Sequence, residues 1–180
     1  DDWTLSLDNS KCVNVAYFDF SKAFDTIPHH RLIAKLKSWG ISGSLLSFIE
    51  NFLVGRTFKV LVNGYYSEEK PVISGTPQGT ILGPLLFIAY ISDISSFCGI
   101  EGITLKLYAD DLKAYVTHSN EIAEMEKLQK FIDKLTGYSA INGLRLQPSK
   151  CFTLYLGRKN CKYPSWLMAH HFWKGNLSVT

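Results

Sequence analysis

Two adjacent aspartates, Asp110 and Asp111, lie between apolar stretches whose alternation predicts two strands joined by a tight turn. Adjacent strand residues point to opposite faces, so only a turn can bring both carboxylates near one ion. An isolated Asp-Asp pair is more often a solvated acidic turn. A third carboxylate nearby changes this: charges about 5 Å apart repel by roughly 3 kcal/mol at an effective dielectric of 20. Such a cluster needs a cation or a shared proton, and all-oxygen sites suit magnesium or manganese.

The third candidate is Asp19, near the end of an apolar stretch, 12–20, that predicts an interior strand. A carboxylate in such a stretch is paired, is at a strand end, or is a ligand. If a helical and hairpin insertion at about 41–75 is set aside, the predicted order is strand, helix, strand, strand, helix, strand. This is the ferredoxin-like β-α-β-β-α-β plan of the α+β class, in which the first and third strands are neighbours. It would bring together acids 91 positions apart (110 minus 19).

The elements that must position these acids follow from periodicity. Apolar stripes predict helices over about 28–39, 45–53 and 122–135, and Asn63-Gly64 predicts a hairpin turn within 56–66. Residues 150–156 predict another strand. A loop rich in glycine, proline and hydroxyls, 74–84, leads into an apolar stretch that predicts a buried helix. The loop lacks the ending of a P-loop, and is either an ordinary helix entry or a place for a phosphate or base.

Composition sets the limits within which a function must lie. The chain has 180 residues, is 46% hydrophobic and carries a formal charge of +3, which suits one folded domain and is compatible with a polyanionic partner. Its four cysteines are widely spaced, which favours free thiols over a disulfide framework or zinc site. The most apolar run, 81–91, is too short to cross a membrane. We therefore expect a soluble intracellular protein without a membrane partner, with nucleus and cytoplasm both open.

The chain divides into three predicted segments. Residues 1–11 are polar and irregular and look like a truncated lead-in. Residues 12–157 form the domain with the insertion, and 158–180 form a tail without a period.

Four motifs resemble the palm of reverse transcriptases, most closely those of non-LTR retrotransposons. They are FDFSKAFDTIPH at 18–29, GTPQGTILGPL at 75–85, YADD at 108–111 and NGLRLQPSK at 142–150. Each motif alone is weak to moderate evidence, but the ordered set is specific. The resemblance implies a polymerase palm with an insertion of the fingers type.

The resemblance implies an RNA-directed DNA polymerase that adds deoxynucleotides to a primer 3′-hydroxyl. Asp19, Asp110 and Asp111 would be the catalytic carboxylates and would hold two Mg²⁺ ions, with Mn²⁺ as a substitute. One ion would activate the hydroxyl and the other would neutralise the triphosphate. Lys150 matches a lysine proposed as general acid for the departing pyrophosphate, although a solvated lysine is nearly as good an interpretation. The partners would be an RNA template, a DNA primer and deoxynucleoside triphosphates, without an organic cofactor.

Further roles carry over by position. Phe24 matches the steric gate that excludes a 2′-hydroxyl, with core packing as the alternative. The other residues assigned to the nucleotide are Phe20, Pro77, Gln78 and Gly79. Tyr108 would lie near the primer end, and Arg56 and Lys59 could touch phosphates, although a solvated strand face is the more ordinary interpretation. We expect Asp25 to be structural, capping the helix that follows it.

Two alternatives remain beside a working polymerase. The basic residues expected upstream and the primer-grip motif expected downstream are not found, so the chain could be an inactive remnant or a domesticated module that binds nucleic acid or a partner. The second alternative is an unrelated magnesium-dependent phosphohydrolase or cyclase. That alternative leaves Phe24 and the 77–79 tripeptide unexplained.

Overall fold

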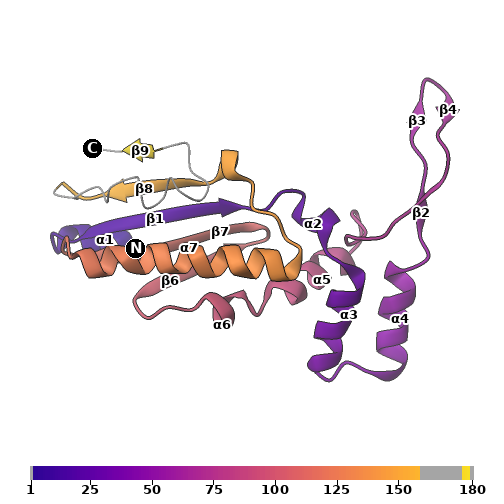
Figure 1. Ribbon diagram of the computed structural model, residues 1–180, viewed down its shortest axis with the longest axis horizontal. Coiled ribbons are helices and arrows are strands. Elements are labelled where there is room, and N and C mark those ends of the chain that lie inside the picture. Colours follow the sequence, from indigo (N-terminus) through magenta and orange to yellow (C-terminus); the bar gives the residue numbers. More distant parts are fainter. Residues whose placement is uncertain (1, 159–175, 179–180) are drawn as a thin grey trace. The chain divides into compact units, whose positions relative to one another are not determined.

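The computed structural model describes residues 2–158 and 176–178 and divides into two compact units. The first, Asp1–Ser21 with Asp93–Thr180, is here called the sheet unit. The second, Lys22–Ser92, is called the loop unit. Both helices and strands are present (Figure 1), so the expected mixture of the two is confirmed. The loop unit is larger than the insertion predicted at about 41–75.

A five-stranded sheet forms the centre of the sheet unit. Its strands are β1 (Cys12–Asp19), β6 (Ile103–Tyr108), β7 (Asp111–His118), β8 (Phe152–Leu156) and β9 (Asn176–Ser178), in the spatial order β6-β7-β1-β8-β9. Strand β1 is antiparallel to both β7 and β8, whereas β9 is parallel to β8. The central position of β1 explains why its sequence is almost continuously apolar. Seven of its eight residues are apolar or buried, and they are distributed over both faces of the sheet.

One face of the sheet is covered by the long helix α7 (Ile122–Asn142), which runs along it in Figure 1. Phe18 of β1 and Phe131 of α7 meet there with ring centroids 5.9 Å apart. The helix ends where Gly143 adopts a left-handed φ of 68°, a conformation that glycine takes without the steric cost of a Cβ. The short helix α6 (Ile94–Cys98) also packs against α7. Burial of Cys98 raises the pKa of its thiol to about 11.

The N-terminal residues correct the sequence-based expectation. Residues 2–8, predicted to be irregular, form the helix α1 (Asp2–Asp8), which packs against β1. Trp3 packs edge-on against Tyr115, with centroids 5.6 Å apart, over a cluster that includes Val13 and Val15. Asp2 accepts a 2.8 Å hydrogen bond from the Tyr115 hydroxyl. Seven residues are too few to form a helix by local preference, so tertiary contacts decide this one.

Two of the predicted apolar stripes form helices in the loop unit, α3 (His29–Ser38) and α4 (Gly43–Leu53), which pack against each other. The short α2 (Ala23–Thr26) precedes them, and α5 (Leu82–Ile91) ends the unit. The predicted hairpin is present as β3 (Leu61–Val62) and β4 (Tyr65–Tyr66), joined by Asn63 and Gly64, which both have positive φ. A second short pair, β2 (Thr57–Phe58) and β5 (Lys70–Pro71), forms its base.

Two expectations for the remaining segments need comment. Helix α5 was predicted to be buried all round, but Leu85 and Ile88 are 57% and 55% exposed, because only one side of the helix meets the rest of the unit. Most of the predicted tail, 158–180, lies outside the described residues. In the described ranges, no helix is long and apolar enough to cross a membrane.

Candidate active site

Strand register places two of the three predicted carboxylates directly opposite each other. Asp19, the last residue of β1, pairs with Asp111, the first residue of β7. Residues in such pairs have Cα atoms about 4.5–5.5 Å apart. Two like charges at paired positions destabilise a sheet, so this arrangement costs folding free energy in return for a concentrated negative charge. Neighbouring strands thus join acids that are 92 positions apart in the chain (111 minus 19).

Asp110 lies in the two-residue turn between β6 and β7, which Tyr108 and Asp111 close as a cross-strand pair. Ala109, the other turn residue, has a φ of 53°. This left-handed conformation costs a residue with a Cβ about 1–2 kcal/mol. The predicted hairpin with acids at its turn is therefore present, and its turn holds backbone strain next to the carboxylates.

Lys150 is the cation nearest to Asp19 in the described residues. It lies in a single 3₁₀ turn, Pro148–Lys150, and its Nζ is 3.3 Å from Oδ2 and 3.4 Å from Oδ1 of Asp19. Gln147, the residue before this turn, is tied to the end of β1 by the 2.8 Å hydrogen bond that its backbone N donates to Asp19 O. Oδ2 of Asp19 is buried and has no hydrogen-bond partner of proper geometry, so the ammonium compensates its charge only by proximity.

These carboxylates fit a divalent ion as a donor set of two. Asp19 and Asp111 offer hard oxygen ligands from paired positions. The buried Oδ2 of Asp19 accepts no hydrogen bond, so a bound cation would supply the partner that it lacks. The expected cluster of three is not present: among residues 2–158 and 176–178, no three His, Cys, Asp or Glu side chains are gathered as metal ligands. Without an ion, mutual repulsion opposes such gathering.

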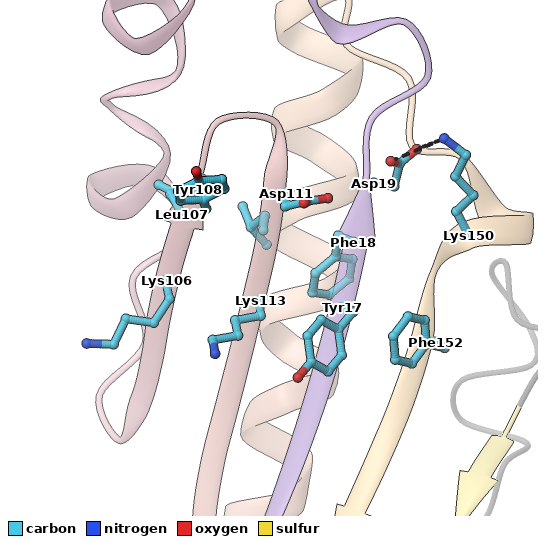
Figure 2. A pocket seen from close by; sticks show the side chains of 11 residues that line it. Tyr17, Phe18, Asp19, Lys106, Leu107, Tyr108, Asp111, Lys113, Lys150 and Phe152 are labelled. Carbon is cyan, nitrogen blue, oxygen red and sulfur yellow. Dashed lines mark hydrogen bonds and ion pairs between the residues drawn. The ribbon is translucent and has the colours of Figure 1, made fainter. Parts of the chain in front are cut away.

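A pocket of about 700 Å³ opens beside the acids on the sheet (Figure 2). Tyr108, which is 83% exposed, lines it together with Asp19 and Asp111. Tyr17 and Phe152 stack in its wall with ring centroids 4.6 Å apart, and burial raises the pKa of the Tyr17 hydroxyl. The sequence did not single out this aromatic pair. Alternation along β1 and β8 could have found it, since both residues share the face that carries Asp19.

In the loop unit, the predicted glycine-rich loop is fastened to the segment 24–29. Gly75 N donates to Ile27 O and Thr76 N donates to Phe24 O, each at 2.8 Å. The side chain of His29, which is buried, lies 2.8 Å from Gly75 O through its Nε2. The sequence did not identify His29. Three hydrogen bonds therefore hold this loop in one position over its partner segment.

Gly75 allows the close approach of the two segments. Its φ is +86°, and a Cβ built on it would lie 2.7 Å from the Asp25 Cα and 2.8 Å from the Asp25 carbonyl oxygen. A backbone atom cannot swing aside like the end of a side chain, so only glycine fits here. Gly79 also has a positive φ, +74°, but a Cβ there would meet nothing within 4 Å.

The carboxylate of Asp25 binds the amide of Gln78: Nε2 of Gln78 donates to Oδ1 of Asp25 at 2.8 Å. The interpretation of Asp25 as a helix cap is wrong, because no side-chain hydrogen bond caps α2 or the following α3. The bond instead orients the Gln78 carboxamide so that its nitrogen is engaged. Asp25 and Gln78 are both exposed, so the pair is accessible to a ligand.

Two phenylalanines of the first motif differ in exposure. Phe24 is half-buried and stacks on Phe87 with centroids 4.3 Å apart, which gives its ring a fixed position and leaves part of it exposed. Phe20 is only 2% exposed, so its side chain is core and cannot contact a nucleotide directly. Pro77 is buried as well. The prediction for Phe20 is thus wrong for its side chain.

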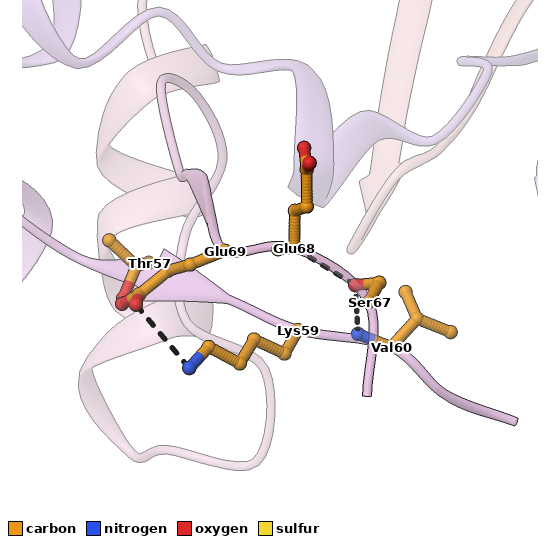
Figure 3. Close-up of polar contacts among 6 residues, drawn as sticks. All are labelled: Thr57, Lys59, Val60, Ser67, Glu68 and Glu69. Atoms are coloured by element: carbon orange, nitrogen blue, oxygen red, sulfur yellow. Dashed lines mark hydrogen bonds and ion pairs between the residues drawn. The ribbon is translucent and has the colours of Figure 1, made fainter. Parts of the chain in front are cut away.

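Lys59 and Arg56 lie in the hairpin segment of the loop unit. Lys59 pairs with Oε2 of Glu69 at 3.5 Å, and the other oxygen of Glu69 accepts a hydrogen bond from Thr57 (Figure 3). Ser67 extends the same ladder by accepting from Val60 N at 2.9 Å. Lys59 therefore has a partner that ties the two arms together, which favours the ordinary interpretation. A phosphate contact for Arg56 stays a prediction.

Comparison with protein families gives a match over residues 4–167 to the model described as reverse transcriptase (RNA-dependent DNA polymerase). The RNA-directed DNA polymerase from mobile element jockey of Drosophila melanogaster is 28% identical over an alignment 185 residues long, which covers 97% of this chain and 20% of the relative. Its counterpart from Drosophila funebris is 30% identical over 81% of this chain and 16% of the relative. The chain thus spans about a fifth or less of the length of these relatives.

Solved structures show the same fold at low identity. Telomerase from Candida tropicalis, in complex with a fragment of telomeric RNA, superposes with a TM-score of 0.66 at 16% identity, covering 89% of this chain and 29% of that one. Apo telomerase of the same species, truncated from its C-terminal domain, has a TM-score of 0.62 at 16% identity and covers 90% of this chain. At this identity the likeness concerns the fold alone.

Proposed function

Because the chain belongs to the reverse transcriptase family, we propose that it is the catalytic palm of an RNA-directed DNA polymerase of a non-LTR retrotransposon. The reaction is the template-directed transfer of a deoxynucleotide to a primer 3′-hydroxyl. The observation that carries the proposal is the register that pairs Asp19 with Asp111 beside a turn containing Asp110. By resemblance, these three residues match the catalytic carboxylates of the family.

The strand order supports a ferredoxin-like palm. Strands β6-β7-β1-β8 are the four strands of the β-α-β-β-α-β plan in an order that keeps the first and third adjacent. In chain order, residues 22–92 come where this plan has its first helix. The acids then lie at the ends of the central strands, where side chains are held by backbone pairing on both sides and need little reorganisation during the reaction.

Within the carboxylate site, the residues of this chain orient and neutralise. Asp19 and Asp111 would hold the divalent ions, with Asp110 completing the set. The chemistry that such ions supply is activation of the attacking hydroxyl and neutralisation of charge on the triphosphate. Lys150, 3.3 Å from Asp19, carries a proton at Nζ close to the reacting groups and is the proposed donor to the departing pyrophosphate.

The loop unit supplies the groups that would select the nucleotide. The partly exposed ring of Phe24, fixed by Phe87, is the proposed barrier to a 2′-hydroxyl. Gln78, whose amide nitrogen is held by Asp25, would present its remaining oxygen and the neighbouring Gly79 backbone to the nucleotide. An unrelated phosphohydrolase would need neither group. Tyr108, exposed beside the acids, is the proposed contact to the primer end.

Primer extension on an RNA template with Mg²⁺ tests the proposal. We expect the 180-residue chain to incorporate deoxynucleotides in preference to ribonucleotides, and the Asp110→Asn, Asp111→Asn variant to lose at least about 10³-fold in rate. Asp8→Asn, on α1, is the matched control and keeps full activity.

Failure of the folded chain to incorporate any nucleotide would reject the claim that it is an enzyme. If such a chain still bound RNA in a salt-dependent way, the domesticated nucleic-acid-binding module would be the better conclusion. Equal use of ribonucleotides and deoxynucleotides would reject the role of Phe24.

A further inference from the structure

Two lysines face each other across the catalytic hairpin. Lys106 of β6 and Lys113 of β7 are directly paired, and like charges at such positions destabilise a sheet. Neither lysine has a carboxylate partner in the described ranges, where the ion pairs involve other lysines. These two paired ammonium groups therefore offer a place for an anion that comes from outside the sheet.

Lys113 is also held on this face of the sheet. Its Nζ lies over the Trp3 ring, 4.8 Å from the centroid. A cation–π contact directs the side chain without cancelling its charge, so the positive potential persists where an incoming anion would meet it. Lys106, on the outer strand of the hairpin, is exposed.

The lysine pair lies one step along the strands from the acids. Residues two apart on a strand share a face and are about 6.6–6.8 Å apart, which places Lys113 next to Asp111 and Lys106 next to Tyr108. All four side chains line the same pocket of about 700 Å³, and Figure 2 shows the lysines on adjacent strands below the acids. The charge on this face of the sheet therefore changes from negative to positive between residues two apart on β7.

The charge pattern selects the chemistry of the ligand. A nucleic-acid strand carries one phosphate for each nucleotide, so a strand whose end lies at the acids places further phosphates at regular intervals beyond them. Lysines, as mobile point charges, suit contacts that hold a backbone without reading its bases. The stacked Tyr17 and Phe152 in the pocket wall add an apolar surface next to the cations.

We propose that Lys106 and Lys113 form a binding site for the phosphodiester backbone of the nucleic-acid strand whose end is positioned at Asp19 and Asp111. The site deepens the proposed function and rests on it. It assigns to the pair the holding of the strand, not the chemistry. Its cost to the sheet is recovered when the strand binds.

Binding of a fluorescently labelled RNA–DNA primer–template, measured by anisotropy over a KCl series, tests this site. Lys106→Gln, Lys113→Gln should reduce the slope of log affinity against log salt by about 1.8 for two lost phosphate contacts on a duplex. Lys106→Arg, Lys113→Arg should keep the slope. The matched control is Lys11→Gln, Lys130→Gln, which removes two exposed lysines before β1 and on α7 and should leave the slope unchanged.

A second readout separates binding from folding. Since Lys106→Gln alone removes a like-charge pair and spares the Lys113–Trp3 contact, its unfolding midpoint should stay the same or rise while affinity falls. If Lys106 had a purely structural role, the unfolding midpoint of Lys106→Gln would instead fall. An unchanged slope in the double Gln variant, with binding by the parent chain intact, overturns the inference and leaves the proposed function standing. A folded parent chain that binds no primer–template overturns both.

Discussion

The sheet unit and the loop unit build their candidate functional residues in opposite ways. In the sheet unit, the cross-strand pairs carry like charges that repel: Asp19 opposes Asp111, and Lys106 opposes Lys113, while Lys150 offsets the charge of Asp19 alone. In the loop unit, they support each other, since the Gln78 amide donates to Asp25. One site is imposed by strand register against its electrostatics, and the other is assembled from its own hydrogen bonds.

The difference teaches where function costs stability. Backbone pairing of β1 with β7 continues over eight residue pairs, which is enough to hold two carboxylates together that would separate in solution. The loop has no such ladder and depends on individual contacts such as that of His29 with Gly75. Substitutions should therefore act with opposite signs on stability in the two units.

The largest effect is expected where the loop approaches its partner segment. Gly75→Ala would place a Cβ 2.7 Å from the Asp25 Cα at a φ of +86°, so we expect a loss of about 3 kcal/mol in the free energy of unfolding. Gly79→Ala is the matched control: it has a similar φ of +74° and open space, and should lose only about 1 kcal/mol. Urea denaturation of both variants measures the difference, and equal losses would show that the close approach does not constrain the loop.

The opposite signs can be tested with one aspartate from each unit. Asp111→Asn relieves repulsion with Asp19 and should raise the free energy of unfolding by about 0.5 kcal/mol, while abolishing polymerisation. Asp25→Ala breaks the hydrogen bond to Gln78 and should lower the free energy of unfolding by about 1 kcal/mol. Thermal unfolding at neutral pH compares the two. Destabilisation by Asp111→Asn would mean that the acids are not in conflict, and the comparison of the units would fail.

The smallest expected effect concerns pH and the end of β7. His118 is 2% exposed, and burial lowers its pKa from the ordinary value of 6.5 although nearby Glu124 acts in the other direction. Its Nδ1 accepts a hydrogen bond from Asn120 N at 3.0 Å, which the neutral ring makes. Below pH 6.5 the unfolded chain binds a proton at this residue that the folded chain does not. The free energy of unfolding therefore decreases as the pH is lowered.

Unfolding midpoints between pH 7.5 and 5 should therefore decrease for the parent chain and decrease less for His118→Gln. Parallel curves for the two proteins would show that His118 does not contribute to acid sensitivity of the sheet unit.

Much of the fold follows from local patterns. The stripes of α3, α4 and α7, the Asn63-Gly64 turn and the hairpin around Asp110 were predicted because each depends on periodicity or on turn chemistry within a few residues. Helix α1 was missed because it is short and is stabilised by Trp3 on Tyr115, a contact 112 positions distant (115 minus 3). The exposed side of α5 was missed for a similar reason, since composition shows that a helix is apolar but not what covers it.

The sequence by itself determined which residues could carry the chemistry. The acidic pair, the glycine-rich loop and the ordered motifs are local features, and the family match over residues 4–167 confirms the reverse transcriptase resemblance that they support. Only the tertiary structure decided how these residues meet: Asp19 opposite Asp111, Lys150 beside Asp19, Gln78 on Asp25, and Lys106 against Lys113. Strand register and loop contacts join residues far apart in the chain, and no local pattern encodes the distance between them.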